Sequence, residues 1–402
     1  MSKRLKNGIT APKGFLAAGI HTGIKQAELL DLALITSETA GPIAGVFTKS
    51  TIPAAPVILD KLHLKKGIGQ AIIINSGNAN AFTGTDGLAH AREMAHLIAS
   101  QLTIPQHHVF VGSTGVIGVP LPMPALRRGI PVLASELKRS GNRDAAQAIM
   151  TTDTRPKAIA VQKQIGGKLV TIGGMAKGSG MIHPDMATML AYLTTDAVIN
   201  QKTLQKILRT VVDQTFNCIS IDGETSTNDT VLCLANGKAG NAPISPGYSS
   251  YEQFQKLVHE ACHYLAMEIC RDGEGATKTI AIKVTEAASH KAARQFANTL
   301  ATSPLVKTAF FGADPNWGRI IAALGRSGYP LRPERIMIAF NNLTIVKNGS
   351  GLGARIEQQV KKIMQRPKFT VSISLGMGTG AATKWTTDLT YDYVKINASY
   401  RS

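Results

Sequence analysis

The chain has 402 residues, of which 44% are apolar and 17% are charged, a composition that excludes disordered and fibrous classes and predicts a large buried core. We find no apolar run long enough to span a membrane, and no apolar stretch follows the basic opening MSKRLKNGITAPKGF, so we expect a cytoplasmic protein without a membrane segment. The formal net charge of +18 comes from scattered Lys and Arg, and only 5% of residues are aromatic, which argues against nucleic acid as a partner and makes a basic binding protein the weaker alternative.

The first half of the chain alternates short apolar runs with amphipathic stretches, which predicts a mixed α and β fold. Three runs are expected to be strands: 43–47, 55–59 and 70–74. In residues 86–102, apolar side chains recur at three- and four-residue spacing, which predicts a helix. The following run, VFVGSTGVIG, predicts a strand that ends in a turn of small residues around Thr114 and Gly115, where backbone N–H groups can face a ligand.

The second half repeats this alternation. Three further strands are expected at 168–172, 189–193 and 369–375. An apolar stripe over residues 204–216 predicts a helix that packs on a sheet. FNCISIDGETSTNDTVLCLANG is expected to form two strands around a polar turn, and residues 239–250 are the best candidate for a linker. We therefore predict an α+β fold.

Residues 259–263 read HEACH, which matches the HExxH pattern in which two histidines one helical turn apart bind zinc. The apolar residues around them predict a helix whose opposite face carries His259 and His263, so we expect both side chains to face solvent. A zinc peptidase built on His259, Glu260 and His263 is therefore a less favoured alternative. The four cysteines have no CxxC spacing and are expected to be reduced thiols: Cys218, Cys233, Cys262 and Cys270.

Two other short patterns are interpreted as structural. SELK at 135–138 fits the SxxK pattern of serine acyl-enzymes, but it lies in a helix-like run and the accompanying SDN and KTG patterns do not follow it. GMGTGAATK at 376–384 resembles a phosphate-binding loop only loosely, because Lys384 is not followed by Ser or Thr. We expect this segment to be a tight turn between strands.

The segment KGSGMIHPDMATML, residues 177–190, places Thr188 between a glycine-rich approach and an apolar run. A Thr hydroxyl is a poor nucleophile unless a base lies beside it, and the α-amine of an N-terminal Thr is such a base. Thr188 becomes N-terminal only if its bond to Ala187 is cut, and a pliable approach with a small residue before the bond favours that cut. The apolar run would hold Thr188 at the edge of a sheet. A Thr that begins a strand often has only a structural role, so the residues alone leave both interpretations open.

Eight segments in order along the chain resemble the ornithine acetyltransferase family, the glutamate N-acetyltransferases of arginine biosynthesis. They are GITAPKGFLAAGIHTGIK, INSGNANA, STGVIG, MTTDT, KGSGMIHPDMATML, DGETSTNDT, DPNWGRI and YDYVKINASYRS. The resemblance implies a layered α/β sandwich similar to N-terminal nucleophile enzymes. It also implies self-cleavage into an α chain of residues 1–187 and a β chain of residues 188–402, which assemble as two α and two β chains.

The resemblance assigns roles to individual residues. Thr188 would be the nucleophile that carries the acetyl group as an ester, and Thr114 and Gly115 would form the oxyanion hole. The substrate-binding positions would be Thr151, Lys177, Thr188, Glu274, Asn397 and Ser402. The chemistry of Lys177 suits an α-carboxylate and that of Glu274 suits a cationic amine. No metal or prosthetic group is implied, and acetyl-CoA is a candidate co-substrate.

The activity implied is transfer of an acetyl group from N-acetylornithine to glutamate in arginine biosynthesis. The alternative keeps Thr188 but makes the protein a self-processing amidohydrolase or aminopeptidase, in which water resolves the acyl-enzyme. The sequence departs from the family pattern at His183, Asp185 and Ser402, and its turn at 376–384 also differs. His183 and Asp185 precede the cut, so we expect them to affect its rate or pH dependence rather than turnover.

Overall fold

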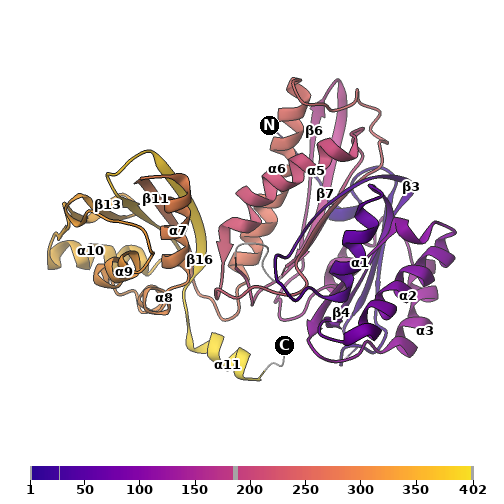
Figure 1. The fold of residues 1–402 in the computed structure, drawn as a ribbon, viewed down its shortest axis with the longest axis horizontal. Coiled ribbons are helices and arrows are strands. Elements are labelled where there is room, and N and C mark those ends of the chain that lie inside the picture. The colour runs from indigo at the N-terminus through magenta and orange to yellow at the C-terminus, as the bar shows by residue number, and fades with distance from the viewer. Residues whose placement is uncertain (1, 27, 184–188, 400–402) are drawn as a thin grey trace.

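The computed structural model describes residues 2–26, 28–183 and 189–399, which form two units, each built on its own β-sheet. Figure 1 shows the first unit, from indigo to pink, and the second unit, from orange to yellow, side by side with the last helix below them. Helices cover the faces of both sheets. The predicted α+β class, with layers of helices on sheets, is therefore confirmed.

Within the described residues, the first sheet has nine strands, and eight of them follow the order β1-β6-β7-β8-β10-β3-β4-β5, with β2 paired to β3. Their bounds are β1 Lys3–Arg4, β2 Phe15–Ile20, β3 Leu32–Phe47, β4 Ile68–Asn78, β5 Val109–Val116, β6 Lys157–Ile165, β7 Lys168–Lys177, β8 Leu190–Thr195 and β10 Thr230–Ala235. Each predicted strand of this unit lies within or overlaps one of these, except the run at 55–59.

Strand β8, which begins two residues after Thr188, lies inside the sheet. It pairs antiparallel with β7 and parallel with β10, and all six of its residues are buried. Thr188, which we expected at the edge of a sheet, lies outside the described residues, but the strand that follows it is an interior strand. An apolar run with no polar alternation is typical of a strand buried on both faces, and such a strand belongs in the interior of a sheet.

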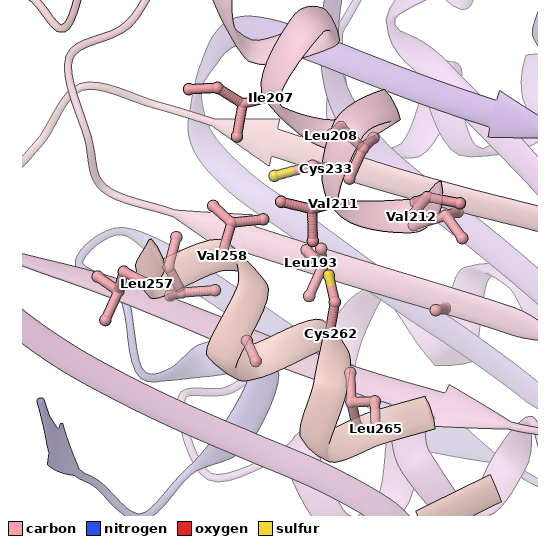
Figure 2. Packing of buried hydrophobic residues seen from close by; sticks show 14 of the residues in the cluster. Leu193, Ile207, Leu208, Val211, Val212, Cys233, Leu257, Val258, Cys262 and Leu265 are labelled. Atoms are coloured by element: carbon pink, nitrogen blue, oxygen red, sulfur yellow. The ribbon is translucent and has the colours of Figure 1, made fainter. Parts of the chain in front are cut away.

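Helices on both faces bury the first sheet. They are α1 Ala55–Leu64, α2 Gly84–Leu102, α3 Met123–Ser135, α4 Asn142–Ala148, α5 Gln201–Gln214 and α6 Ser249–Arg271. Figure 2 shows how α5 and α6 pack: Leu193 of β8 lies between Val211 of α5 and Cys262 of α6, and Cys233 of β10 lies nearby in the same cluster. Helix α5 begins at Asn200, whose side chain accepts a hydrogen bond from the Thr203 N–H at 2.8 Å, as expected for an N-cap. The predicted helices at 86–102 and 204–216 are thus confirmed, the second ending at Gln214.

The predicted strand at 55–59 is wrong, because these residues open helix α1. Pro56 lies in the first turn, where its missing N–H costs nothing, whereas in a strand it would interrupt the ladder. The helix buries Val57 and Leu59 and continues to Leu64. A five-residue apolar run cannot distinguish the two structures by its period, so the proline was the informative residue.

The second sheet has seven strands in the described residues, in the order β14-β13-β12-β15-β11-β16-β9. Their bounds are β9 Ile219–Ser220, β11 Thr279–Ala287, β12 Met337–Phe340, β13 Leu343–Lys347, β14 Ser350–Gly351, β15 Lys368–Ser374 and β16 Gly380–Thr387. Its helices are α7 His290–Ala301, α8 Pro304–Phe311, α9 Trp317–Gly325 and α10 Ala354–Met364, and α11 Tyr391–Ser399 follows. The alternation predicted for 369–375 is confirmed, since every second side chain is buried there.

The structure also tests the predictions made for three connecting segments. The polar turn of residues 221–229 lies between two strands as predicted, but β9 and β10 belong to different sheets. Residues 239–250 connect β10 to α6 within the first unit, and Ile244 is fully buried, so this segment is not a linker between the units. Residues 376–379 connect β15 to β16, which lie on opposite sides of β11, and Lys384 is buried within β16.

Lys307 of α8 provides a pH-dependent test of the second unit. Its buried Nζ donates hydrogen bonds to the hydroxyls of Thr386 and Thr387 at 3.2 Å each, and burial lowers its pKa to about 8. The pKa of an unfolded lysine is about 10.4, so from pH 8 upward the unfolded chain holds more protons at this site than the folded chain does. The contribution of Lys307 to the free energy of unfolding should therefore rise from pH 8 to 10. In urea titrations, wild type should gain stability relative to Lys307→Met over this window, and a pH-independent difference would contradict the assignment.

Candidate active site

A partly open pocket lies where the first sheet, the segment before Ile182 and helix α11 meet. It contains every predicted oxyanion-hole and substrate residue that the structure describes. Its lining residues are Ala79, Thr114, Gly115, Ile117, Thr151, Thr152, Lys177, Gly180, Met181, Ser226, Asn228, Glu274 and Asn397.

Thr114 and Gly115 lie at the end of β5, where the strand closes against β4. Gly115 has φ +132°, and a Cβ placed there would lie 2.3 Å from the backbone carbon of Gly77 and 2.5 Å from the nitrogen of Asn78. Only glycine allows this approach. The turn predicted around Thr114 and Gly115 is placed too early, because both residues still belong to β5 and the chain bends only at 117–119. Thr114 and Gly115 line the pocket.

Lys177, the last residue of β7, brings a buried cation to the same wall. Its Nζ donates a hydrogen bond to Oγ1 of Thr114 at 3.2 Å, and the side chain is only 3% exposed. Burial lowers the pKa of Lys177, and the nearby carboxylates of Asp153 and Glu274 partly oppose that shift. A hydroxyl that accepts from Lys177 keeps its own hydrogen free, so Thr114 can still donate a hydrogen bond into the pocket.

Glu274 supplies a carboxylate to the same pocket. Its Oε2 accepts a hydrogen bond from Nδ2 of Asn397 in α11 at 2.8 Å, and its backbone N–H donates to the carbonyl of Ser179 at 2.8 Å. A Cβ at Gly180 would lie 2.3 Å from the Glu274 carboxylate, so the absence of a side chain at 180 makes room for it. The pocket thus presents a cation and an anion, which suits a zwitterionic ligand.

A buried ion network supports two walls of the pocket. Asp153 accepts hydrogen bonds from the N–H of Thr151 at 3.0 Å, from the N–H of Gly178 at 2.7 Å and from Nζ of Lys157 at 2.6 Å. Lys157 also donates to Asp272 at 2.5 Å. Burial would raise the pKa of Asp153, but the charges of Lys177 and Lys157 lower it overall, so this carboxylate stays ionised. Asp153 therefore holds Thr151 and the chain after Lys177 in place.

Removing Lys157 should test this network. The Lys157→Met variant would leave Asp153 and Asp272 as buried carboxylates without their shared cation, and breaking a buried ion pair in this way costs about 3 to 5 kcal/mol. We expect a loss of that size in the free energy of unfolding measured by urea titration. Lys163→Met, on the same strand but partly exposed, is the matched control and should change stability little. Equal losses in both variants would contradict a stabilising role of the network.

Three of the predicted residues cannot be placed. Ala187, Thr188 and Ser402, together with Asp185, lie outside the described residues. The pocket residues to which the sequence analysis gave no role are Ala79, Ile117, Thr152, Gly180, Met181, Ser226 and Asn228. Ser226 and Asn228 belong to the DGETSTNDT segment. Both side chains are buried, and the sequence pattern alone does not indicate which polar residues of this segment are buried.

The HEACH pattern lies on α6 and has a structural environment. The rings of His259 and His263 stack with centroids 5.8 Å apart, and Trp385 of the second sheet packs edge-on against His263 at 5.3 Å. Both histidines are half-buried, and Trp385 of the second unit packs on His263, so the expectation that both face solvent holds only in part. Glu260 accepts a hydrogen bond from Ser2. Among the described residues, no group of three or more His, Cys, Asp or Glu could hold a metal ion.

Three remaining predictions concern the cysteines, membrane-spanning segments and the SELK pattern. All four cysteines are described and are free thiols, as predicted. In the described part of the chain, no helix is both long and apolar enough to cross a bilayer. Ser135 of the SELK pattern ends helix α3 and donates to the carbonyl of Val132 at 2.8 Å, which is a structural role.

Known proteins match this chain along almost its whole length. The model of the ArgJ family matches residues 16–402. The chain is 48% identical over 400 residues to the "Arginine biosynthesis bifunctional protein ArgJ" of Symbiobacterium thermophilum and 47% identical over 402 residues to that of Caldanaerobacter subterraneus, with 99% of each chain covered. It also resembles the crystal structure of this bifunctional protein from Bacillus halodurans, at 42% identity and a TM-score of 0.50, a match that covers 52% of this chain and 98% of that chain.

Proposed function

The chain belongs to the ArgJ family, and from that premise we propose that it is a glutamate N-acetyltransferase of arginine biosynthesis. It transfers the acetyl group of N2-acetylornithine to glutamate, which gives ornithine and N-acetylglutamate. The observation that carries the proposal is the convergence of Thr114, Gly115, Lys177, Glu274 and Asn397 on one pocket, although they are spread over nearly 300 residues of sequence.

The nucleophile in this proposal is Thr188, freed by self-cleavage after Ala187. The cut would divide the protein between β7 and β8, which are hydrogen-bonded neighbours, so the chains 1–187 and 188–402 would stay joined in one sheet. A division into two chains is supported by the solved structure from Bacillus halodurans. Nearly all of that solved chain, 98%, matches this protein, yet the match covers only 52% of this protein, which is close to the share that residues 188–402 make up.

In the first half-reaction, the hydroxyl oxygen of Thr188 attacks the acetyl carbonyl carbon and its proton passes to the α-amine of Thr188. The hydroxyl of Thr114 and the N–H of Gly115 donate hydrogen bonds to the oxyanion that forms, and the Lys177 cation behind Thr114 strengthens this stabilisation. Collapse of the intermediate breaks the amide bond. The proton then moves to the leaving amine, ornithine departs, and Thr188 keeps the acetyl group as an ester.

In the second half-reaction, the neutral α-amine of glutamate attacks the acetyl ester, and the same proton route returns the hydrogen to Thr188. Lys177 would bind a substrate carboxylate, while Glu274, held by Asn397, would bind a cationic amine. Thr151 and Ser402 would complete the substrate site. The curated relatives are named bifunctional, and we extend this to the chain as a second activity, acetylation of glutamate from acetyl-CoA.

Assembly and compartment follow from the same proposal. We propose two α and two β chains per molecule and a cytoplasmic location, which the four free thiols support because a reducing compartment keeps cysteines unpaired.

The test is an assay of purified protein with N-acetylornithine, with and without glutamate. Ornithine and N-acetylglutamate should form in equal amounts only when glutamate is present, and a separate reaction with acetyl-CoA and glutamate should release free CoA thiol. Continuous release of acetate without glutamate would instead identify a hydrolase and overturn the transferase proposal.

A further inference from the structure

Two aspartates of one segment hold the backbone on both sides of the bond proposed to be cut. The segment comprises residues 219–230, which run from β9 to the start of β10. Asp222 contacts the chain before the cut, and Asp229 contacts the chain after it. All the atoms in these contacts belong to described residues.

Asp222 holds two consecutive amide groups upstream of the cut. Its Oδ2 accepts a hydrogen bond from the N–H of Met181 at 2.5 Å, and its Oδ1 accepts one from the N–H of Ile182 at 2.8 Å. Met181 has φ +57°, a left-handed conformation that costs energy for a residue with a side chain. Adjacent N–H groups in such a bend form a concavity that binds an anion, so the carboxylate stabilises the bend.

The segment makes further contacts with this approach. The N–H of Ile221 donates to the carbonyl of Ile182 at 2.8 Å, and Nδ1 of His183 lies 3.1 Å from the hydroxyl of Ser220. The chain is therefore held by hydrogen bonds up to residue 183, five residues before Thr188.

Asp229 holds the chain downstream of the cut. Its Oδ1 accepts a hydrogen bond from the N–H of Met189 at 3.1 Å, the amide that joins Met189 to Thr188. The carbonyl of Met189 accepts from the N–H of Thr230 at 3.2 Å, which continues into the β8–β10 ladder. Asp229 is 1% exposed, and its Oδ2 has no hydrogen-bond partner among residues 2–26, 28–183 and 189–399. A carboxyl group buried at such a cost suggests a role beyond filling space.

The same segment connects the cut to the second unit. Strand β9 pairs with β16 of the second sheet, and the hydroxyl of Tyr393 in α11 donates to Oδ2 of Asp222 at 3.3 Å. Helix α11 also carries Asn397 of the pocket. Residues 219–230 therefore connect the approach to the cut, strand β8 and the last helix.

We propose that Asp222 and Asp229 are positioning residues for the self-cleavage reaction, an inference that rests on the proposed function. In that reaction, the hydroxyl oxygen of Thr188 bonds to the carbonyl carbon of Ala187, the bond from this carbon to the Thr188 nitrogen breaks, and the hydroxyl proton ends on that nitrogen. Water then hydrolyses the ester, which leaves a carboxylate on Ala187 and a free hydroxyl on Thr188. Asp222 fixes the chain at Met181 and Ile182, Asp229 fixes it at Met189, and correct orientation of the reacting groups is a large part of an intramolecular rate.

The test measures the rate of cleavage in the full chain by intact mass at timed intervals after rapid purification. Asp222→Ala and Asp229→Ala should each slow cleavage by about 100-fold, the loss expected from misplacing a reacting group by about 1 Å. Asp229→Asn should cleave at close to the wild-type rate, because its amide oxygen can still accept the Met189 N–H.

Asp196 provides the matched control. It is also buried and accepts from two backbone groups, the N–H of Thr171 at 2.8 Å and that of Lys13 at 3.2 Å, but it lies just beyond the far end of β8. Asp196→Ala should lose similar thermal stability and still cleave normally. Equal slowing in Asp196→Ala, or cleavage of either Ala variant at the wild-type rate, would overturn the inference. A wild type that stays uncut would instead refute the proposed function, and the same series detects that outcome.

Discussion

Thr188→Ala is expected to remain a single uncut polypeptide with no acetyltransferase activity, whereas wild type should be recovered as two fragments. The physical reason is that the proposed mechanism uses one hydroxyl twice, first against the Ala187 carbonyl and then against the acetyl group. Without the hydroxyl neither step has a nucleophile, and without the cut Thr188 has no free α-amine to act as its base. A denaturing gel with intact mass should show wild-type fragments of about half the full mass, the second beginning at Thr188.

Thr188→Ser is the matched control, because serine keeps the hydroxyl and loses only a methyl group. It should still be cut, with activity reduced but measurable. Turnover in Thr188→Ala above the level of heat-inactivated protein, or an active wild type that is never cut, would contradict Thr188 as the activated nucleophile.

Gly115→Ala should lower kcat for acetyl transfer by about 100-fold or more, the cost typical of losing one oxyanion-hole donor. The added Cβ would lie 2.3 Å from the Gly77 backbone carbon, so the end of β5 must move away from β4 and take the Gly115 N–H with it. Because the donor acts on the transition state, KM should change much less than kcat. Steady-state kinetics with N-acetylornithine and glutamate would measure both constants.

Gly118→Ala is the matched control, because it replaces a glycine of positive φ without forcing β5 away from β4. Gly118 also has a positive φ, of +80°, but a Cβ there would meet nothing within 4 Å. The substitution should cost about 1 kcal/mol of stability through backbone strain and leave kcat close to wild type. Similar losses of kcat at 115 and 118 would show that the turn tolerates no side chain for reasons unrelated to the oxyanion.

Sequence reasoning was most successful where a pattern repeats with one period. The stripe that forms α5 and the alternation that forms β15 were both visible, because each spans enough residues to distinguish a helix from a strand. It failed at α1, where a short apolar run was compatible with either. It also could not assign β9 and β10 to different sheets, since two strands close in sequence need not pair.

At the candidate site, the sequence identified residues that line the pocket but not those that hold them in place. Thr114, Gly115, Lys177, Glu274 and Asn397 were identified from ordered segments of the sequence, and the structure brings them to one pocket. The residues that hold them were not identified. Asp153 accepts hydrogen bonds from the backbone N–H groups of Thr151 and Gly178, and such contacts leave no spacing or period in a sequence.

The sequence by itself determined the helices and strands with a sustained period and the chemical identity of the groups at the site. Only the tertiary structure decided which of these groups meet. Lys157 and Asp272 are 115 residues apart in the sequence, yet Lys157 donates a hydrogen bond to Asp272 at 2.5 Å. Asp222 and Asp229 likewise accept hydrogen bonds from the backbone of Met181 and Met189, about 40 residues earlier in the chain. The physical reason is that local periodicity reports which face of an element is buried, whereas the partner of a buried charge or amide depends on how the sheets pack.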